Sequence, residues 1–199
     1  MCKVISIVNQ KGGCSKTTSA VNIGIGLANA GKKVVLIDAD AQGSLTASLG
    51  FQKPDELKVT LATIMAKTIN EEEIDLSKVI LHHEECVDLV PGNIELSGLE
   101  VQLSNVLSRE LILKEFVDSL RDSYDYILID CAPSLGMMTI NALVTADEVI
   151  IPVQAAYLPV KGLQQLMKTI NMVKRRLHTK WKILLILYVR VCSPSAPLQ

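Results

Sequence analysis

The residues best suited to chemistry lie together in the stretch NQKGGCSKTT, at positions 9–18, directly after an apolar run. A Gly-containing turn that leads into a helix presents backbone N–H groups and the positive end of the helix dipole to an anion. We expect Lys16 to reach the β- and γ-phosphates of a nucleotide and Thr17 to occupy one coordination position of Mg²⁺. The predicted nucleotide contacts are Gly12, Gly13, Cys14, Ser15, Lys16, Thr17 and Thr18.

This loop departs from the usual pattern G-x-x-x-x-G-K-[ST], because Gln10 and Ser15 stand at its two glycine positions. A deviant pattern, K-G-G-x-G-K-[ST], fits everything except Ser15 and adds Lys11. If position 15 requires φ > 0, serine costs about 1–2 kcal/mol there, whereas micromolar binding corresponds to about 8 kcal/mol. We therefore predict that ATP binding is retained but weakened. The alternative is an ordinary Gly-rich turn with two solvated lysines, which the order of strand, loop and helix disfavours.

Two further segments place carboxylates after apolar runs. VVLI is followed by DADAQG, which contains Asp38 and Asp40, and YILI is followed by Asp130 in DCAPSLG. Ligands of open α/β sheets bind at the carboxyl ends of the strands, so we expect these carboxylates on the same rim as the phosphate loop. Asp130 is the predicted carboxylate for Mg²⁺, acting through a water. Helix-capping or turn carboxylates are the alternative interpretation of Asp38 and Asp40.

A sheet is needed to bring these loops together, and short β-branched runs alternate with helical patterns along the chain. The predicted strands, apolar on both faces as in a buried parallel sheet, are 3–8, 34–37, 87–90, 126–129 and 149–153. The predicted helices are 17–30, 95–107, 110–121 and 162–177. Residues 51–86 are more polar and indicate a surface excursion with one or two helices. We expect a doubly wound α/β fold, with a mostly parallel sheet and helices on both faces.

The composition indicates a globular protein with a single core. The 199 residues are 49% hydrophobic, which is enough for one large core. Five scattered cysteines without a CxxC pair indicate reduced thiols in a cytosol. No apolar run reaches the roughly 18 residues that a membrane-spanning helix needs. The net charge is −1, so affinity for nucleic acid would have to come from a local patch.

Two clusters of polar residues have more than one interpretation. The dense basic cluster fits either a solvated helix end, where the dipole favours cations, or a DNA-binding patch, and consists of Lys174, Arg175, Arg176, His178, Lys180 and Lys182. The run 82–86 contains metal-ligand residue types, but neighbours on an extended segment point in opposite directions. A polar surface turn is therefore the preferred interpretation of that run.

Three stretches taken together resemble the ParA-type partition ATPases of the ParA/MinD superfamily of deviant Walker A proteins. They are NQKGGCSKTT, GIGLANAGKKVVLIDADAQGSLTASLG and YDYILIDCAPSLGMMTINALVTADEVIIPVQ. The resemblance covers about residues 3–175. It implies a P-loop NTPase fold of the deviant Walker A type and an Mg²⁺-dependent ATP hydrolase that is weak and stimulated by a partner.

The resemblance also implies roles for single residues. Lys11 is the signature lysine that reaches the partner subunit's nucleotide across an ATP-sandwiched dimer, while Lys16 acts within its own subunit. Asp40 orients or activates the attacking water, so the implied catalytic residues are Lys11, Lys16 and Asp40. The implied metal site is Thr17, Asp38 and Asp130. Ala41 stands where the family has proline, and its loss would loosen the turn and slow hydrolysis.

As a function, the resemblance implies an ATP-dependent dimerisation and DNA-binding switch in plasmid, mobile-element or chromosome partitioning. Such a switch forms a homodimer with ATP, binds non-specific DNA, works with a ParB-type partner, is cytoplasmic and nucleoid-associated, and binds no membrane. One open alternative is a catalytically impaired or inactive truncated remnant that binds a nucleotide or a partner. Another is a MinD-like division-site ATPase, which needs an amphipathic C-terminal helix that SPSAPLQ does not provide.

The resemblance fades past about Lys174, where we expect a truncated or frame-altered C-terminus. The predicted organisation is an incomplete P-loop ATPase domain over 1–182, followed at 183–199 by a strand within KILLILYV and an atypical tail.

Overall fold

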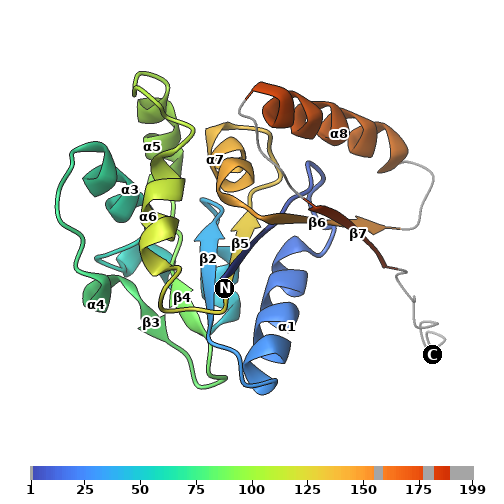
Figure 1. The fold of residues 1–199 in the computed structure, drawn as a ribbon. Helices are drawn as coiled ribbons and strands as arrows, with labels where there is room; N and C mark the ends of the chain where they lie inside the picture. The colour runs from blue at the N-terminus through green and yellow to red at the C-terminus, as the bar shows by residue number, and fades with distance from the viewer. Residues whose placement is uncertain (1, 155–158, 177–181, 189–199) are drawn as a thin grey trace, which may run out of the picture.

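The computed structural model describes residues 2–154, 159–176 and 182–188. They form a doubly wound α/β fold around a seven-stranded sheet in the order β3-β4-β2-β5-β1-β6-β7 (Figure 1). Every neighbouring pair is parallel except β3 with β4. The predicted fold class is confirmed. The strands are β1 (Lys3–Ile7), β2 (Val34–Ala39), β3 (Leu81–His82), β4 (Asp88–Val90), β5 (Tyr126–Cys131), β6 (Glu148–Gln154) and β7 (Lys182–Tyr188).

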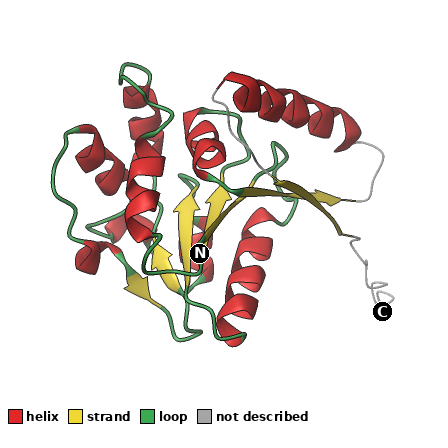
Figure 2. Cartoon of the chain, in the orientation of Figure 1, coloured by secondary structure: helices red, strands yellow, loops and turns green. Residues whose placement is uncertain are grey.

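Helices lie on both sides of the strands (Figure 2). They are α1 (Lys16–Asn29), α2 (Ser44–Ser48), α3 (Leu61–Ile69), α4 (Leu76–Val79), α5 (Glu95–Leu103), α6 (Ile112–Leu120), α7 (Met137–Thr145) and α8 (Pro159–Arg176), with a 3-10 turn, η1, at Pro54–Glu56. Within the described part of the chain, none of these helices is long and apolar enough to cross a membrane.

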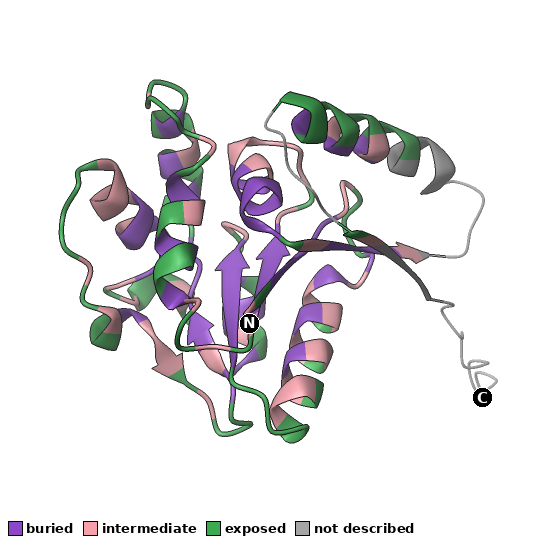
Figure 3. Ribbon diagram, in the orientation of Figure 1, coloured by how far each residue is buried: buried purple, intermediate pink, exposed green. Residues whose placement is uncertain are grey.

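The sheet is covered twice because its strands are apolar on both faces. Along β2, Val34 and Leu36 join one apolar cluster, which includes residues of α1 and α2. Val35 and Ile37 join a second cluster, which includes residues of α3, α5, α6, α7 and α8. Figure 3 shows the central strands buried between these two layers. The continuous apolar runs in the sequence therefore indicate a sheet with no solvent-exposed face.

All five predicted strands are present, and the KILLILYV segment contains β7, which pairs with β6. The interpretation of residues 51–86 as a surface excursion is wrong for α3. Its Leu61, Ile64 and Met65 are fully buried and belong to the main core. Because polar segments flank α3 on both sides, the average hydrophobicity of residues 51–86 does not reveal this short apolar stripe. α7 was not among the predicted helices.

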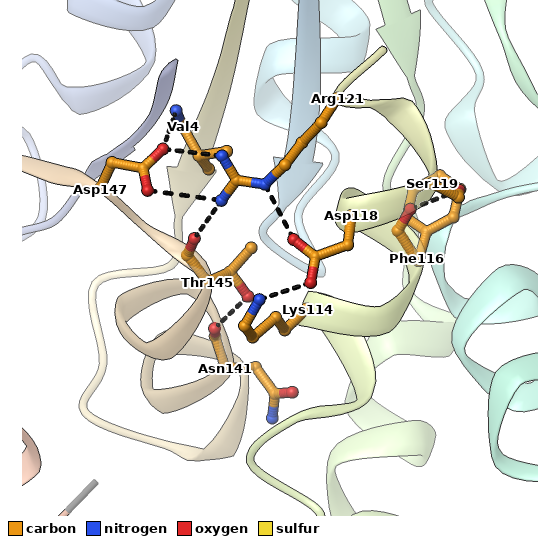
Figure 4. A network of polar contacts seen from close by, with 9 residues as sticks. All are labelled: Val4, Lys114, Phe116, Asp118, Ser119, Arg121, Asn141, Thr145 and Asp147. Carbon is orange, nitrogen blue, oxygen red and sulfur yellow. Dashed lines mark hydrogen bonds and ion pairs between the residues drawn. The ribbon is translucent and has the colours of Figure 1, made fainter. Parts of the chain in front are cut away.

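A polar network fixes the edge of the sheet where β1 begins (Figure 4). Arg121, at the end of α6, donates to Asp147 at 2.9 Å and to Asp118 at 2.8 Å. The carboxylate of Asp147 also accepts a hydrogen bond from Val4 N at 2.9 Å. The network thus ties α6 and the α7–β6 turn to the first strand. The loop after β1 leaves from the opposite end of that strand.

Candidate functional site

The loop between β1 and α1 is held by its own polar groups and by the neighbouring strand. Asn9 Nδ2 donates to Pro152 O of β6 at 2.7 Å, and Asn9 Oδ1 accepts from Lys11 N at 3.0 Å. The carbonyl of Lys11 accepts from Cys14 Sγ at 3.0 Å and from Lys16 Nζ at 3.4 Å. These bonds close the loop into a compact turn at the N-terminus of α1.

Ser15 occupies the N-cap of α1 in the left-handed conformation, with φ 62° and ψ 29°. The φ > 0 condition raised by the sequence is therefore met. Its side chain makes no capping bond to the helix, although its carbonyl accepts from Ser19 N at 2.8 Å. The strain of about 1–2 kcal/mol is thus not offset by a side-chain cap. Gly13 has a similar φ of 68°, which glycine adopts without that cost.

The first turn of α1 meets the end of β5 at two side chains. Thr17 Oγ1 donates to Asp130 Oδ2 at 2.6 Å. Asp130 Oδ1 is buried and has no hydrogen-bond partner among the residues that the structure describes. Burial raises the pKa of Asp130 to about 7, and the nearby charge of Asp38 adds to the rise, whereas Thr17 and Lys16 oppose it. A hydroxyl oxygen beside an unsatisfied carboxylate oxygen is a set of hard donors that fits Mg²⁺.

Lys16 brings a cation to the same place. Its residue is only 7% exposed, and its ammonium group is directed back over the loop to the carbonyl of Lys11. Apart from each glycine and its two chain neighbours, no atom of the described residues lies within 4 Å of the position that a Cβ would take at Gly12 or Gly13. An open Gly-rich turn, a helix N-terminus and a converging lysine together fit a phosphate group.

Asp38 is fully buried at the end of β2, in register with Asp130 on β5. Its Oδ2 accepts from Thr46 N at 2.8 Å and from Thr46 Oγ1 at 2.7 Å, and its Oδ1 accepts from Asp40 N at 3.2 Å. Burial raises its pKa to about 6 against these hydrogen bonds. Both oxygens of Asp38 therefore hold the following turn. Asp40 lies in that turn, half-buried, and accepts from Gln42 N at 3.0 Å.

The structure brings the predicted residues of three separate segments to one edge of the sheet. The loop after β1 carries Lys11 and Lys16, the turn after β2 carries Asp40, and β5 ends at Asp130. Lys11 and Thr18 are exposed, whereas Cys14 is buried. Sequence reasoning missed Thr46, although a hydroxyl in the first turn of the helix after a buried aspartate was a usable signal.

The other polar clusters lie elsewhere. The run 82–86 forms the turn between β3 and β4, closed by the bond from His83 N to Val87 O at 3.0 Å. His82 is paired with Asp88 at 2.5 Å, and within the described ranges no three or more His, Cys, Asp or Glu side chains are grouped so that they could hold a metal ion among themselves. In the basic cluster, Lys174 and its two arginine neighbours are exposed at the end of α8, and Lys182 is exposed on β7. His178 and Lys180 fall outside the described residues.

Comparison with known proteins gives matches along most of the chain. The AAA_31 family, described as an AAA domain, matches residues 2–183. The sporulation initiation inhibitor protein Soj of Bacillus subtilis is 43% identical over 179 residues, which cover 90% of this chain and 69% of Soj. The chromosome partitioning protein ParA of Myxococcus xanthus is 41% identical over 183 residues, which cover 91% of this chain and 62% of that protein. The chain spans 58% to 69% of the length of the curated relatives it matches.

Solved structures agree with this match. A cobyrinic acid a,c-diamide synthase from Mycobacterium smegmatis, with bound ATP analogue and magnesium, superposes with a TM-score of 0.87 at 36% identity. That alignment covers 94% of this chain and 75% of the synthase. A plasmid partition protein from Borrelia burgdorferi bound to AMPPNP superposes with a TM-score of 0.75 at 31% identity, over 94% of this chain and 75% of that protein.

Proposed function

The chain belongs to the AAA_31 family as a ParA-type partition ATPase, and from this premise we propose that it acts as an ATP-dependent switch in DNA partitioning. ATP and Mg²⁺ are its cofactors, in keeping with the ligands of its structural relatives. One observation carries the proposal. The hydroxyl of Thr17 and the unpartnered buried oxygen of Asp130 converge beside Lys16 at the end of a Gly-rich loop.

Each residue has a defined part in this proposal. The loop amides and Lys16 hold the phosphates, and Thr17 with Asp130 holds Mg²⁺, Asp130 acting through a water. Asp38, the third residue of the metal site expected from the sequence, is not a ligand in this proposal, because both of its oxygens already accept hydrogen bonds from Asp40 N and from Thr46. Magnesium, when bound, neutralises charge that develops on the phosphoryl oxygens. Asp40 accepts a hydrogen bond from the attacking water, and Asp38 keeps the Asp40 turn in place through the bond to Asp40 N. The half-exposed position of Asp40 supports this role because water reaches it.

In this proposal, Lys11 is the residue through which two copies of the chain dimerise. Its side chain is exposed at the rim of the loop, which supports contact with a nucleotide held by a second copy of the chain. An ammonium group about 4 Å from a phosphate charge gains about 4 kcal/mol at an effective dielectric constant near 20, before desolvation. The homodimer therefore depends on the γ-phosphate. ATP hydrolysis would release the monomers.

The partners in this proposal are non-specific DNA and a ParB-type protein, in the cytoplasm at the nucleoid. The names of the relatives, which include chromosome partitioning and plasmid partition proteins, support this assignment. The exposed basic end of α8 supports the DNA contact, because lysine and arginine side chains neutralise phosphates.

The test is ATP binding and turnover by the full chain. Calorimetry with Mg²⁺ should show saturable ATP binding that Lys16→Ala abolishes, and hydrolysis with DNA and partner present should exceed that of Asp40→Ala. Binding with turnover no higher than that of Asp40→Ala would support the second candidate, a non-catalytic nucleotide-binding module. The left-handed Ser15 and the absence of proline at Ala41 are the observations that favour this second candidate.

A further inference from the structure

Most of the exposed large hydrophobic side chains lie on one stretch of the surface. In the part of the chain that the structure describes, five such side chains are exposed, and four of them fall within residues 94–111: Ile94, Val101, Leu107 and Leu111. Val101 is 72% exposed and Leu107 is 91% exposed. Ile94 and Val101 are seven positions apart along α5, so they share one face of the helix. An exposed apolar cluster of this kind is typical of an interaction surface.

The same stretch exposes no charge over most of its length. Every exposed residue between positions 97 and 108 is uncharged, in a chain of which 21% of the residues are charged. We call these exposed residues the neutral strip. Glu100, the one charged residue of the interval, is half-buried and accepts a hydrogen bond from Met138 N at 3.3 Å. Apolar side chains without charges are typical of the centre of a protein–protein interface. DNA, by contrast, is bound through lysine and arginine.

Hydrogen bonds from α7 hold the loop at the end of the neutral strip. Asn141, which is fully buried on α7, donates through Nδ2 to Arg109 O at 2.8 Å and accepts at Oδ1 from Leu113 N at 3.1 Å. Within the loop, Arg109 Nη1 donates to Ser104 O at 2.5 Å. Because these bonds order the loop within one copy of the chain, a partner that buries its apolar side chains has less conformational entropy to remove.

The neutral strip lies toward the same side of the molecule as the candidate site. Strands β2 and β5 are parallel to each other, and β5 is parallel to β1, so all three end at one edge of the sheet. In Figure 1 the arrowheads of β2 and β5 point toward the side on which the loop between α5 and α6 lies. The loop after β1, with the exposed Lys11, leaves from that edge as well. A second copy that meets Lys11 across this edge therefore approaches from the side of the neutral strip.

We propose that the neutral strip is a second contact of the ATP-dependent homodimer and that its occupant is a second copy of this chain. This inference rests on the proposed function, because it names a further surface that the two copies share besides Lys11. Each copy of a symmetric dimer contributes the same surface. A strip without charge adds no repulsion between like charges to such a pair. Lys11 makes the dimer depend on the nucleotide, whereas Val101 and Leu107 add apolar contact area.

Sedimentation of the full chain with AMPPNP and Mg²⁺ tests whether the strip contributes to dimerisation. Val101→Lys and Leu107→Lys should each raise the dissociation constant of the dimer about tenfold, because each places a charge in an apolar contact. Nucleotide binding by the dilute monomer should stay unchanged. Met172→Lys is the matched control, since it adds the same charge at the exposed large hydrophobic residue that lies on α8, and it should leave the dimer unchanged. Equal dissociation constants in the unaltered chain and both strip variants would overturn the proposal.

Photocrosslinking identifies the occupant of the strip. The purified full chain with Leu107→benzoylphenylalanine should give a crosslinked dimer with AMPPNP and Mg²⁺ but not without nucleotide, whereas Met172→benzoylphenylalanine should give none in either condition. If the unaltered chain dimerised but position 107 gave no nucleotide-dependent product, this inference alone would fail, and the strip would belong to another partner. If the unaltered chain bound AMPPNP without dimerising, the dimer of the proposed function and this contact would fail together.

Discussion

At the scale of single residues, Ser15 is a costly departure from the pattern of a phosphate loop. Its φ of 62° lies in the region that favours glycine, and its hydroxyl caps nothing in the helix. If the loop has this conformation without nucleotide, the strain lowers the stability of the fold. If the loop adopts it only when nucleotide is bound, the strain weakens nucleotide binding. The measurable quantity is the sum of the changes in the free energies of unfolding and of nucleotide binding.

Ser15→Gly should therefore release about 1 kcal/mol in total, as higher stability, tighter ATP binding, or a share of each. The left-handed conformation costs serine about 1–2 kcal/mol, and the greater freedom of glycine in the unfolded chain offsets part of it. Urea unfolding and calorimetric titration of ATP measure the two parts. Gly13→Ala is the matched control, since it adds a side chain at φ 68° with no atom within 4 Å. It should lose a similar amount, and a Ser15→Gly variant unchanged in both measurements would contradict the strain argument.

The chemistry-bearing residues were predictable from the sequence because their signals are local. Lys16 and Thr17 stand at fixed positions in a loop, and Asp130 directly follows a buried strand. Thr46 was missed although its place in the first turn of the helix after Asp38 was a local signal. Its second contact, with Gly92 N, spans 46 positions, and no local pattern in the sequence records it.

At the scale of elements, the strands could be predicted and two helices could not be fully recognised. The strands are short β-branched runs, and burial on both faces keeps those runs continuous. In α7, seven of the nine residues are buried, so no polar face alternates with an apolar one and the helical period is absent. In α3 the apolar stripe is present but short, so the polar residues around it dominated the interpretation.

Helix α2 is tied to the ends of two strands through one hydroxyl. Thr46 Oγ1 donates to Asp38 Oδ2 at 2.7 Å and accepts from Gly92 N at 3.0 Å, and all three residues are buried. The neighbouring Thr46 N donates to the same carboxylate oxygen. This arrangement connects α2 and β2 with Gly92, which follows β4, and it holds the turn that contains Asp40.

Thr46→Val should destabilise the fold, and more at pH 8 than at pH 5. Burial raises the pKa of Asp38 to about 6, above its value in the unfolded chain, so the carboxyl contributes stability below about pH 4 that is lost as pH rises through 6. Removing a donor raises the folded-state pKa further and extends this loss to higher pH. We expect urea unfolding to show that Thr46→Val lowers the free energy of unfolding by about 1 kcal/mol at pH 5 and by about 2–3 kcal/mol at pH 8. Thr46→Ser, which keeps the hydroxyl, should lose less at both values, and a pH-independent loss would contradict this account.

At the scale of the whole molecule, the candidate site and the basic end of α8 belong to different elements of one fold. The sheet edge carries the loop after β1 and the carboxylates of β2 and β5, whereas α8 packs beyond α7 (Figure 1). On α8 the residues Leu166, Ile170 and Val173 are buried at steps of three and four positions, so they form one apolar stripe of the helix. The basic residues of its last turn face solvent. The cations at this end of α8 can therefore contact an anionic polymer without disturbing the packing of the apolar core.

Replacing this basic turn should weaken DNA binding in a way that salt dependence identifies. Each cation that neutralises a phosphate contributes about −0.9 to the slope of log K against log salt. With ATP and Mg²⁺ present, changing the three cations to glutamine should therefore make the slope shallower by about 2–3 and leave ATP binding unchanged; the residues are Lys174, Arg175 and Arg176. Fluorescence anisotropy with two unrelated duplexes measures the slope, and both should respond equally because phosphate contacts carry no sequence information. The matched control replaces three exposed lysines on the far side of the fold, Lys53, Lys58 and Lys78. An equal change of slope in the control would mean that net charge, and not α8, governs DNA binding.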